Sequence, residues 1–417
     1  MLNPNSENLQ RPALEGGQKT RTEFLVFGKP HFGPEEMNEV IDTLKSGWVG
    51  TGPRTAQFEK DFSTYIRGNS DFPVYSVGVN SCTAALHLAL TCLDLKSDDE
   101  VIVPALTFCS SANAILHSGA VPVFADIDQE RQCLTAATIE KAITPKTKAV
   151  VVVHFAGRAA PMDEILAVTK PRGIEIIEDC AHAVETEFEG LHAGLFGFAG
   201  CFSFYATKNV SCAEGGMFVT RNEKVAERAR KLALHGLSKD AHKRFTATGY
   251  AHYDFDEVGF KYNMPDIAAA IGIHQLKRVE HNYLLRTAIW NAYIDGLKNL
   301  PIRLPFLPTD RSKERHALHL FQIRVDARVR DKLLSAYAAE GVGVGVHYLS
   351  LSKARLYQQF VRPGQSFEVA ETIASQTISL PVGTAMTAAD AEDAISATRK
   401  LLRYYLMEGN SNATQIS

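Results

Sequence analysis

The sequence has no run of lysine and arginine interleaved with aromatic residues, and its formal net charge is only −3. A protein that binds a phosphate backbone needs a basic surface, so we expect no nucleic-acid partner. No stretch approaches the roughly 20 apolar residues of a membrane span, and the polar N-terminus has no apolar signal core. These absences predict a cytoplasmic protein without a membrane partner.

Paired cysteines are also missing. The chain has seven cysteines, an odd number, and no two of them form a C-x-x-C pair. A disulfide framework needs an even set, and a zinc knuckle needs closely spaced pairs. Both kinds of site are therefore excluded as an explanation of the fold.

The regular part of the chain begins near residue 34. Residues 1–24 are polar and without a period, which predicts a flexible leader. In residues 34–47, Met37, Val40, Ile41 and Leu44 have the spacing of an amphipathic helix that ends at Gly47. Residues 55–66 repeat that spacing and predict a second helix.

After these helices, short apolar runs alternate with helical segments. The runs are rich in β-branched residues and cover 73–78, 99–104, 121–126, 148–154 and 174–179. Strands buried on both faces and separated by helices are typical of a parallel sheet. We expect a large α/β domain over residues 25–280 with a mostly parallel sheet.

The remainder predicts a second, smaller domain. A helical segment over 265–297 links the two parts, and strand and helix patterns between 321 and 405 indicate an α+β domain over 281–408. The last residues, 409–417, are polar and predict a disordered tail.

Candidate ligand groups occur where predicted strands end. Ser81, Cys82 and Thr83 open a helix, whose free N–H groups can bind an anion. Asp179 and Phe108 follow two other strands, and in an open parallel sheet such ends meet at one edge. Each residue alone is more often a helix cap, a turn residue or a core residue.

The presence of Lys208 favours a shared role in catalysis for these strand-end residues. It lies in CFSFYATKNVSCAEGG, among small, aromatic and hydroxyl side chains, with Glu214 as its nearest acid. Burial lowers the pKa of such an amine toward reactivity. An amine, an anion site, a carboxylate and a ring face are what pyridoxal phosphate requires. The alternative is a structural lysine whose ammonium group reaches water.

Several motifs in order carry a family resemblance. They include NSCTAALHLAL, PALTFCSSANAI, VHFAGRAAPMDEI, EDCAHA, SFYATKNVSCAEGG and GFKYNMPDIAAAIG. From about residue 24 to 405 the chain resembles the DegT/DnrJ/EryC1/StrS family of sugar aminotransferases. It is most similar to the branch that makes UDP-4-amino-4-deoxy-L-arabinose.

The resemblance implies a fold-type I, pyridoxal-phosphate-dependent aminotransferase that forms a homodimer with shared active sites. Lys208 would hold the cofactor as a Schiff base and then transfer protons. Asp179 would pair with the pyridine nitrogen, His182 would approach the phenolic oxygen, and Phe108 would stack on the ring.

Other implied positions surround the cofactor's phosphate and the substrate. The amides of Thr83 and Ala84 and the hydroxyl of Ser203 would bind the phosphate, and Asn263 would reach it from the other subunit. Many members have glycine at Cys82, so we expect this side chain to point away from the phosphate. His154 and His347 lie where the family lines its substrate cleft, and each is either a structural histidine or a substrate contact.

The implied reaction is transamination from L-glutamate to a keto sugar, with ping-pong kinetics. Relatives with histidine in place of Lys208 dehydrate their substrate, so the lysine favours amino transfer. The acceptor is expected to be a nucleotide-linked 4-keto or 3-keto sugar, with a cyclitol ketone as the alternative. Two other classes are open: a silent binding protein with this fold, and a dinucleotide oxidoreductase. No G-x-G-x-x-G follows the first strand, which disfavours the oxidoreductase.

Overall fold

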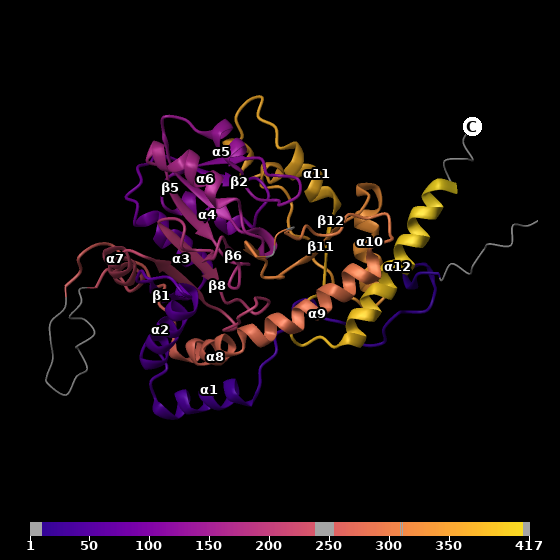
Figure 1. The fold of residues 1–417 in the computed structure, drawn as a ribbon, viewed down its shortest axis with the longest axis horizontal. Helices are drawn as coiled ribbons and strands as arrows, with labels where there is room; N and C mark the ends of the chain where they lie inside the picture. Colours follow the sequence, from indigo (N-terminus) through magenta and orange to yellow (C-terminus); the bar gives the residue numbers. More distant parts are fainter. Residues whose placement is uncertain (1–10, 238–253, 309, 311, 412–417) are drawn as a thin grey trace, which may run out of the picture.

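The computed structural model describes residues 11–237, 254–308, 310 and 312–411, which form a large α/β part and a smaller part beside it (Figure 1). A seven-stranded sheet forms the centre of the large part, in the order β1-β9-β8-β5-β4-β2-β3. The strands are β1 Tyr75–Val79, β2 Glu100–Pro104, β3 Val121–Ala125, β4 Thr147–Val153, β5 Glu175–Asp179, β8 Ala199–Ser203 and β9 Gly216–Thr220.

Most of this sheet is parallel, as predicted. The pairs β2–β3, β2–β4, β4–β5 and β5–β8 are parallel, whereas β9 is antiparallel to both β1 and β8. Parallel neighbours end at the same edge. The carboxyl ends of β2, β4, β5 and β8 therefore lie side by side.

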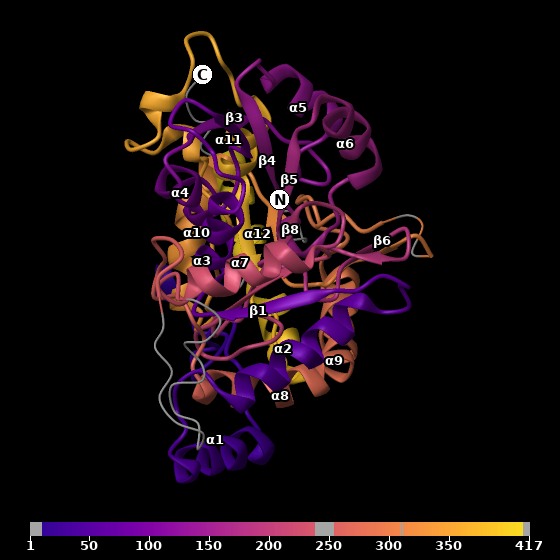
Figure 2. The ribbon, with the colours of Figure 1, turned by 90° about the vertical axis from the view of Figure 1, so that its left-hand side faces the viewer.

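Helices cover both faces of the sheet (Figure 2). On one face, α3 Cys82–Thr91 packs on β8 and β9, α4 Cys109–His117 on β2 and β3, and α7 Glu223–Ala233 on β1. On the other face lie α2 Pro53–Arg67 and α8 Asp266–Lys277, which share a core cluster with Phe202 and Met217. The residues next to these two in the strands, Cys201 and Phe218, belong to the core cluster of the first face. Helices α5 Ala136–Ala142 and α6 Met162–Thr169 complete this part, with 3₁₀ turns η2 Phe155–Gly157 and η3 Lys170–Arg172.

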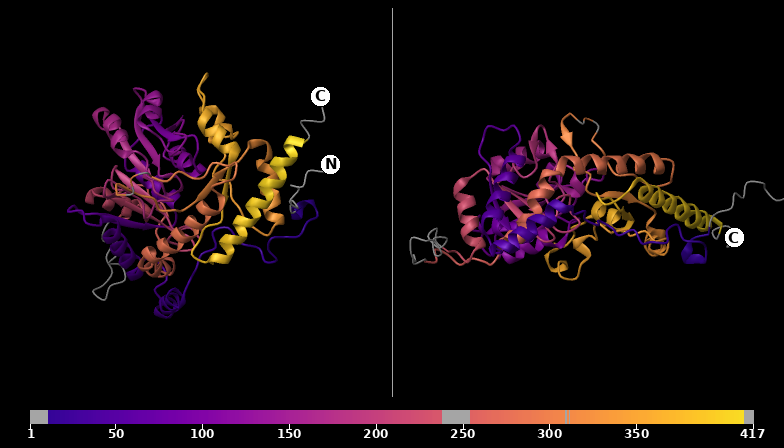
Figure 3. Two further views of the ribbon diagram at one scale, coloured as in Figure 1. Left: turned by 45° about the vertical axis from the view of Figure 1, so that its right-hand side comes forward. Right: turned by 90° about the horizontal axis from the view of Figure 1, so that it is seen from below.

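The predicted helical segment 265–297 is two helices, because α8 stops before Arg278 and α9 Val279–Leu297 follows. A second core cluster joins α9 to β11 Phe321–Arg324, α10 Ala327–Ala339, β12 Thr377–Leu380 and α12 Ala388–Ser411. Figure 3 shows these orange to yellow segments together, beside the large part. A small sheet combines β6 Glu187–Phe188, β7 Leu191–His192 and β10 Glu314–Arg315.

Part of the smaller domain packs into the core of the larger one. Phe367 and Ala370, at the start of α11 Glu368–Gln376, belong to the same cluster as Phe124 of β3. Turns η5 Leu351–Lys353 and η6 Gln358–Phe360 lie in the same segment. The boundary predicted near residue 281 is therefore crossed by apolar contacts.

Helix α1 Pro34–Ser46 forms where it was predicted, but its buried face is not the apolar one. Glu36 is 2% exposed, pairs with Arg278 and accepts an N–H from Gln275 at 2.9 Å. The apolar stripe faces outward instead, with exposed fractions between 46% and 58% at Met37, Ile41, Leu44 and Trp48. Charged contacts to α8 decide which face of the helix is buried.

Residues 11–24, the described part of the expected leader, are held by hydrogen bonds and an ion pair, whereas a flexible segment was predicted. The carboxylate of Glu340 accepts the backbone N–H groups of Ala13 and Thr20, both at 2.8 Å, and η1 Ala13–Glu15 forms beside it. Arg21 pairs with Asp390 at 2.8 Å. Composition alone missed these contacts because their partners lie more than 300 residues away. At the other end, α12 continues to Ser411, and residues 412–417 of the expected tail lie outside the described residues, as do 1–10 of the leader.

None of the helices in the described ranges combines the length and the apolar character that a bilayer crossing takes.

Candidate active site

A cavity of about 410 Å³ opens at the carboxyl edge of the sheet. Seven of the ten predicted site residues line it, and they come from strand ends, helix starts and turns far apart in the sequence: Thr83, Phe108, Asp179, His182, Ser203, Lys208 and His347. Ala84, His154 and Asn263 are not among its lining residues. The strand-end rule therefore brought together residues that do share one cavity, and their roles there stay predictions.

Lys208 lies in the turn that follows β8, where its backbone N–H bonds to the carbonyl of Tyr205 at 2.9 Å. Burial lowers the pKa of its amine to about 8, and the nearby Cys82 and Asp179 partly oppose that shift. Within the described ranges, no hydrogen bond or ion pair holds the amine nitrogen. A substantial fraction of the amine is thus neutral near pH 8 and able to attack a carbonyl carbon.

Asp179 ends β5 and is almost fully buried. One carboxylate oxygen accepts the hydroxyl of Ser111 at 2.7 Å, and the other accepts the N–H of Ala181 at 3.1 Å. Burial raises the pKa of this carboxyl, while those two hydrogen bonds lower it. A protonated ring nitrogen at this point would compensate the buried charge.

The N-terminus of α3 forms the anion end of the cavity. Ser81 caps the helix by accepting the N–H of Ala84 at 3.1 Å, so the amide of Ala84 is already used, contrary to the expectation that it binds phosphate. Thr83 and Ser203 both line the cavity. Their amide and hydroxyl groups fit a phosphate.

The second glycine of the Glu-Gly-Gly turn, Gly216, is required by close packing against the backbone of α3. A methyl group placed on it would lie 2.5 Å from the carbonyl carbon of Ser81 and 2.6 Å from the nitrogen of Cys82. These are backbone atoms, which cannot move aside cheaply. Only glycine lets β9 approach the start of α3 so closely.

Cys82 occupies the Asp179 side of the cavity. Its thiol donates to the carbonyl of Cys201 at 3.4 Å, and the sulfur lies 4.0 Å from a carboxylate oxygen of Asp179. Burial raises the pKa of this thiol well above its ordinary value, so it stays protonated. The side chain lines the cavity. That it points away from the phosphate stays a prediction.

Phe108 is the N-cap residue of α4, is 54% exposed and lines the cavity. The ring of Tyr348 packs beside it, with centroids 5.6 Å apart. A partly exposed aromatic ring in one cavity with a carboxylate and an amine suits a stacked heteroaromatic ring.

His182 lines the cavity, but both of its ring nitrogens have protein partners. Nδ1 accepts the N–H of Ala156 at 3.2 Å, and Nε2 lies 3.1 Å from the hydroxyl of Tyr348. Burial, followed by the charge of Lys208, lowers the pKa of His182 well below its ordinary value. The ring is therefore neutral, and its predicted contact with the cofactor would share Nε2 with Tyr348.

Of the two histidines expected in the substrate cleft, only His347 lies there. Its Nδ1 lies 2.9 Å from the hydroxyl of Ser379, and burial followed by the charge of Lys208 lowers its pKa to about 3. It is thus a neutral group on the cavity wall.

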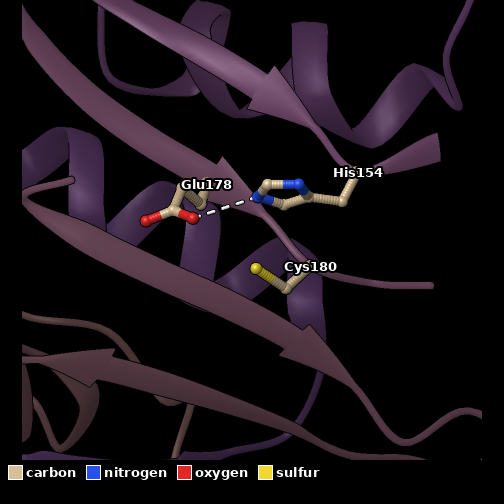
Figure 4. Close-up of side chains that lie close together, drawn as sticks. All are labelled: His154, Glu178 and Cys180. Carbon is tan, nitrogen blue, oxygen red and sulfur yellow. Dashed lines mark hydrogen bonds and ion pairs between the residues drawn. The ribbon is translucent and has the colours of Figure 1, made fainter. Parts of the chain in front are cut away.

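His154 is fully buried, does not line the cavity, and pairs with Glu178 at 3.0 Å (Figure 4). Cys180 lies close to both, in an arrangement that could hold a metal ion. Glu178 already accepts three backbone N–H groups, from Gly194, Phe196 and Gly197. Nδ1 of His154 accepts the N–H of Ala160 at 3.2 Å. His154 therefore has the structural role of the two that were expected. Both of its ring nitrogens and both oxygens of Glu178 already have hydrogen-bond partners within the protein.

Asn263 lies outside this chain's cavity. Its side-chain amide donates to the hydroxyl of Thr51 at 2.6 Å, and its oxygen accepts from Lys261 at 2.6 Å. The predicted contact of Asn263 with the phosphate of a neighbouring subunit stays a prediction, and it would require these hydrogen bonds to be shared or exchanged.

Sequence reasoning missed other cavity residues, of which Tyr348 is the most informative. It follows His347 directly, so the motif GVGVHY contained it. Nothing in its local pattern indicates that the chain returns to the cavity from the smaller domain.

Comparison with known proteins agrees with this geometry. The model of the DegT/DnrJ/EryC1/StrS aminotransferase family matches residues 30–399. The spore coat polysaccharide biosynthesis protein SpsC of Bacillus subtilis is 41% identical over 390 residues, covering 92% of this chain and 98% of that protein.

Solved structures agree as well. The putative sugar aminotransferase Spr1654 of Streptococcus pneumoniae, in its PMP form, superposes with a TM-score of 0.85 at 29% identity, covering 93% of this chain and all of that one. DesV of S. venezuelae, in complex with a ketimine intermediate, has a TM-score of 0.79 at 32% identity and covers 88% and 94% of the two chains. The chain belongs to the DegT/DnrJ/EryC1/StrS family and is a sugar aminotransferase of fold type I that depends on pyridoxal phosphate.

Proposed function

We propose that this enzyme transfers the amino group of L-glutamate to a nucleotide-linked keto sugar, at its fourth or third carbon. The observation that carries the proposal is the unpaired amine of Lys208 in one cavity with Asp179 and the start of α3. Pyridoxal phosphate, when bound, supplies an aldehyde for the amine and a ring that accepts electrons.

The residues of the cavity fit this cofactor. Lys208 would bond to the aldehyde carbon and, once released, carry a proton to and from the substrate carbon. Asp179 would accept the N–H of the ring and keep that nitrogen protonated. Thr83 and Ser203 would bind the phosphate, and Phe108 would cover the ring face.

Two cavity residues from the smaller domain bear on the chemistry of the acceptor. These are His347 and Tyr348, and both are neutral polar groups. Hydroxyl-rich sugars are bound well by neutral donors and acceptors. The name of the relative SpsC places that protein in polysaccharide biosynthesis, which supports a sugar acceptor here.

A second copy of the chain would complete the site. The outward stripe on α1 is apolar and exposed, and Asn263 is held outside its own chain's cavity. Burying the stripe between two copies would remove apolar surface from water. In such a dimer Asn263 would reach the phosphate in the partner's cavity.

The test is the visible absorption spectrum of the protein with pyridoxal phosphate, before and after L-glutamate. We expect a band that converts to the pyridoxamine form with glutamate, and no band in Lys208→Ala. Steady-state rates with a keto-sugar acceptor should give parallel double-reciprocal lines. Intersecting lines would contradict the two-step scheme, and activity with a cyclitol ketone alone would reassign the acceptor. A band without turnover on any acceptor would favour a binding protein.

A further inference from the structure

Of the described residues of the smaller domain, two line the cavity, His347 and Tyr348. The groups proposed to hold the cofactor all come from the large domain. A substrate that enters after the cofactor therefore meets this second wall. The role that we infer for Tyr348 on this wall rests on the proposed function.

The direction of the Tyr348 hydroxyl is set through His182. Because Nδ1 of His182 accepts the N–H of Ala156 at 3.2 Å, the hydrogen of the neutral ring must be on Nε2. Ala156 has φ +59°, a left-handed conformation that an alanine adopts at a cost of about 1 kcal/mol. The fold thus maintains an unfavourable backbone conformation at the residue that fixes this tautomer.

The other ring nitrogen of His182, Nε2, is hydrogen-bonded to Tyr348. Nε2–H donates to the phenolic oxygen at 3.1 Å, so this oxygen acts as an acceptor toward His182. The hydrogen of the phenol must then point elsewhere, and no acceptor for it occurs in the part of the chain that the structure describes. Burial raises the pKa of Tyr348, which keeps that hydrogen in place.

We infer that the Tyr348 hydroxyl donates a hydrogen bond to the reacting oxygen of the substrate, and that His182 positions it. In the first half-reaction the α-carbon of the donor gives its proton to Lys208 and its electron pair to the cofactor; a water oxygen then bonds to this carbon as its C–N bond breaks, becoming the ketone oxygen of the product while the nitrogen stays on the cofactor. In the second, the acceptor's carbonyl oxygen takes up two protons and leaves as water as the new C–N bond forms, and the same carbon then regains a proton from Lys208 and the electron pair from the cofactor. A neutral donor beside this oxygen assists both half-reactions, because the second runs the same steps in reverse on the other substrate.

The experiment compares Tyr348→Phe with Tyr357→Phe. Tyr357 is the more deeply buried of the two, and its hydroxyl donates to Asn113 at 2.6 Å, outside the cavity. With pyridoxal phosphate bound, single-turnover conversion by L-glutamate should be about 30-fold slower in Tyr348→Phe and unchanged in Tyr357→Phe. The half-saturating glutamate concentration should change less than about threefold, because the loss belongs to the transition state. The absorption band before glutamate should be the same in all three proteins.

A second readout is independent of turnover. Nitrogen-15 NMR of labelled histidine should show His182 neutral with its hydrogen on Nε2, in the wild type and in Tyr348→Phe alike. His182→Gln, which keeps an N–H donor near Nε2, should convert faster than His182→Ala.

Four results would overturn the inference: equal rates in wild type and Tyr348→Phe, equal slowing in both tyrosine variants, a hydrogen on Nδ1 of His182, or no advantage of glutamine over alanine. If the wild type forms its band and converts while one of these holds, the proposed function stands and the inference falls. If the wild type fails to convert, both fall.

Discussion

Burial makes Lys208 a usable nucleophile. The residue follows a strand end, and its amine shares a cavity with one buried carboxylate, so the cost of desolvating the ammonium form dominates its pKa. The sequence could predict the lysine, Asp179 and Phe108, because each lies at a strand end or in a local motif. The cap that uses the Ala84 amide is a local contact with Ser81, which the cap preference of serine already indicated. The sequence could not predict that His154 pairs with Glu178 away from the cavity, because that contact depends on a tertiary partner.

Lys208 should therefore titrate near pH 8 in the cofactor-free protein. Only the neutral amine attacks the aldehyde, so the rate of band formation should rise about tenfold per pH unit below the pKa and level off above it. The pKa is about 8 instead of 10.5 because burial disfavours the charged form. Stopped-flow absorbance between pH 6 and 10 measures this rate. A rate that keeps rising up to pH 10 would show an ordinary lysine.

At the scale of elements, most helices and strands were predictable from apolar spacing, since each one buries a periodic face. Helix α1 shows the limit of that rule. Its apolar stripe is exposed because Glu36 and Glu39 bind Arg278, His274 and Arg54 on the other face. Spacing identifies a helix but not which face its partners will cover.

The contact between β9 and α3 should control cofactor affinity. Gly216→Ala would push the added methyl group into the backbone of Ser81 and Cys82, which moves the helix end that is proposed to bind phosphate. We expect pyridoxal phosphate to bind at least about tenfold more weakly, as measured by titrating the absorption band. Gly50→Ala is the control, because an added methyl group there meets no atom within 4 Å. Equal affinities in the two variants would contradict this role.

A buried ion pair fastens α9 to the large domain. Arg286 of α9 pairs with Glu185, both almost fully buried, and Asn209 donates to the same carboxylate at 2.8 Å. Arg286→Met would leave that carboxylate without its cation and should cost about 3 kcal/mol of unfolding free energy in urea titrations. The double variant with Glu185→Gln should recover part of the loss.

The exposed pair Lys298–Asp295 on the same helix provides the comparison. Lys298→Met should cost less than about 1 kcal/mol, because solvent screens that pair. If Arg286→Met were as mild as Lys298→Met, the buried pair would not be holding the helix.

At the scale of the molecule, the two-part architecture was predictable from the order of patterns, whereas the way the parts contact each other was not. Tyr348 shows why: the resemblance placed its neighbour His347 in the substrate cleft, but only the folded chain brings the Tyr348 hydroxyl within 3.1 Å of His182, which lies 166 residues away in the sequence. The same holds for residues 11–24, whose partners lie on α10 and α12.

The proposed dimer is the prediction that belongs to this scale. Ile41→Asp with Leu44→Asp places two charges in the exposed stripe of α1, which should separate the copies. Light scattering should give twice the 45.8 kDa of the chain for the wild type and 45.8 kDa for the variant. Asp42→Asn with Lys45→Gln, on exposed neighbouring positions, should stay dimeric. A dimeric double-aspartate variant would place the interface elsewhere.

The central claim is that Lys208 is the residue that bonds to the cofactor. Borohydride reduction of the protein loaded with pyridoxal phosphate fixes that bond, and peptide mass spectrometry then locates it. The account predicts the modification on Lys208 alone, and none in Lys208→Ala. Modification of another lysine at equal yield, or none in the wild type, would contradict it.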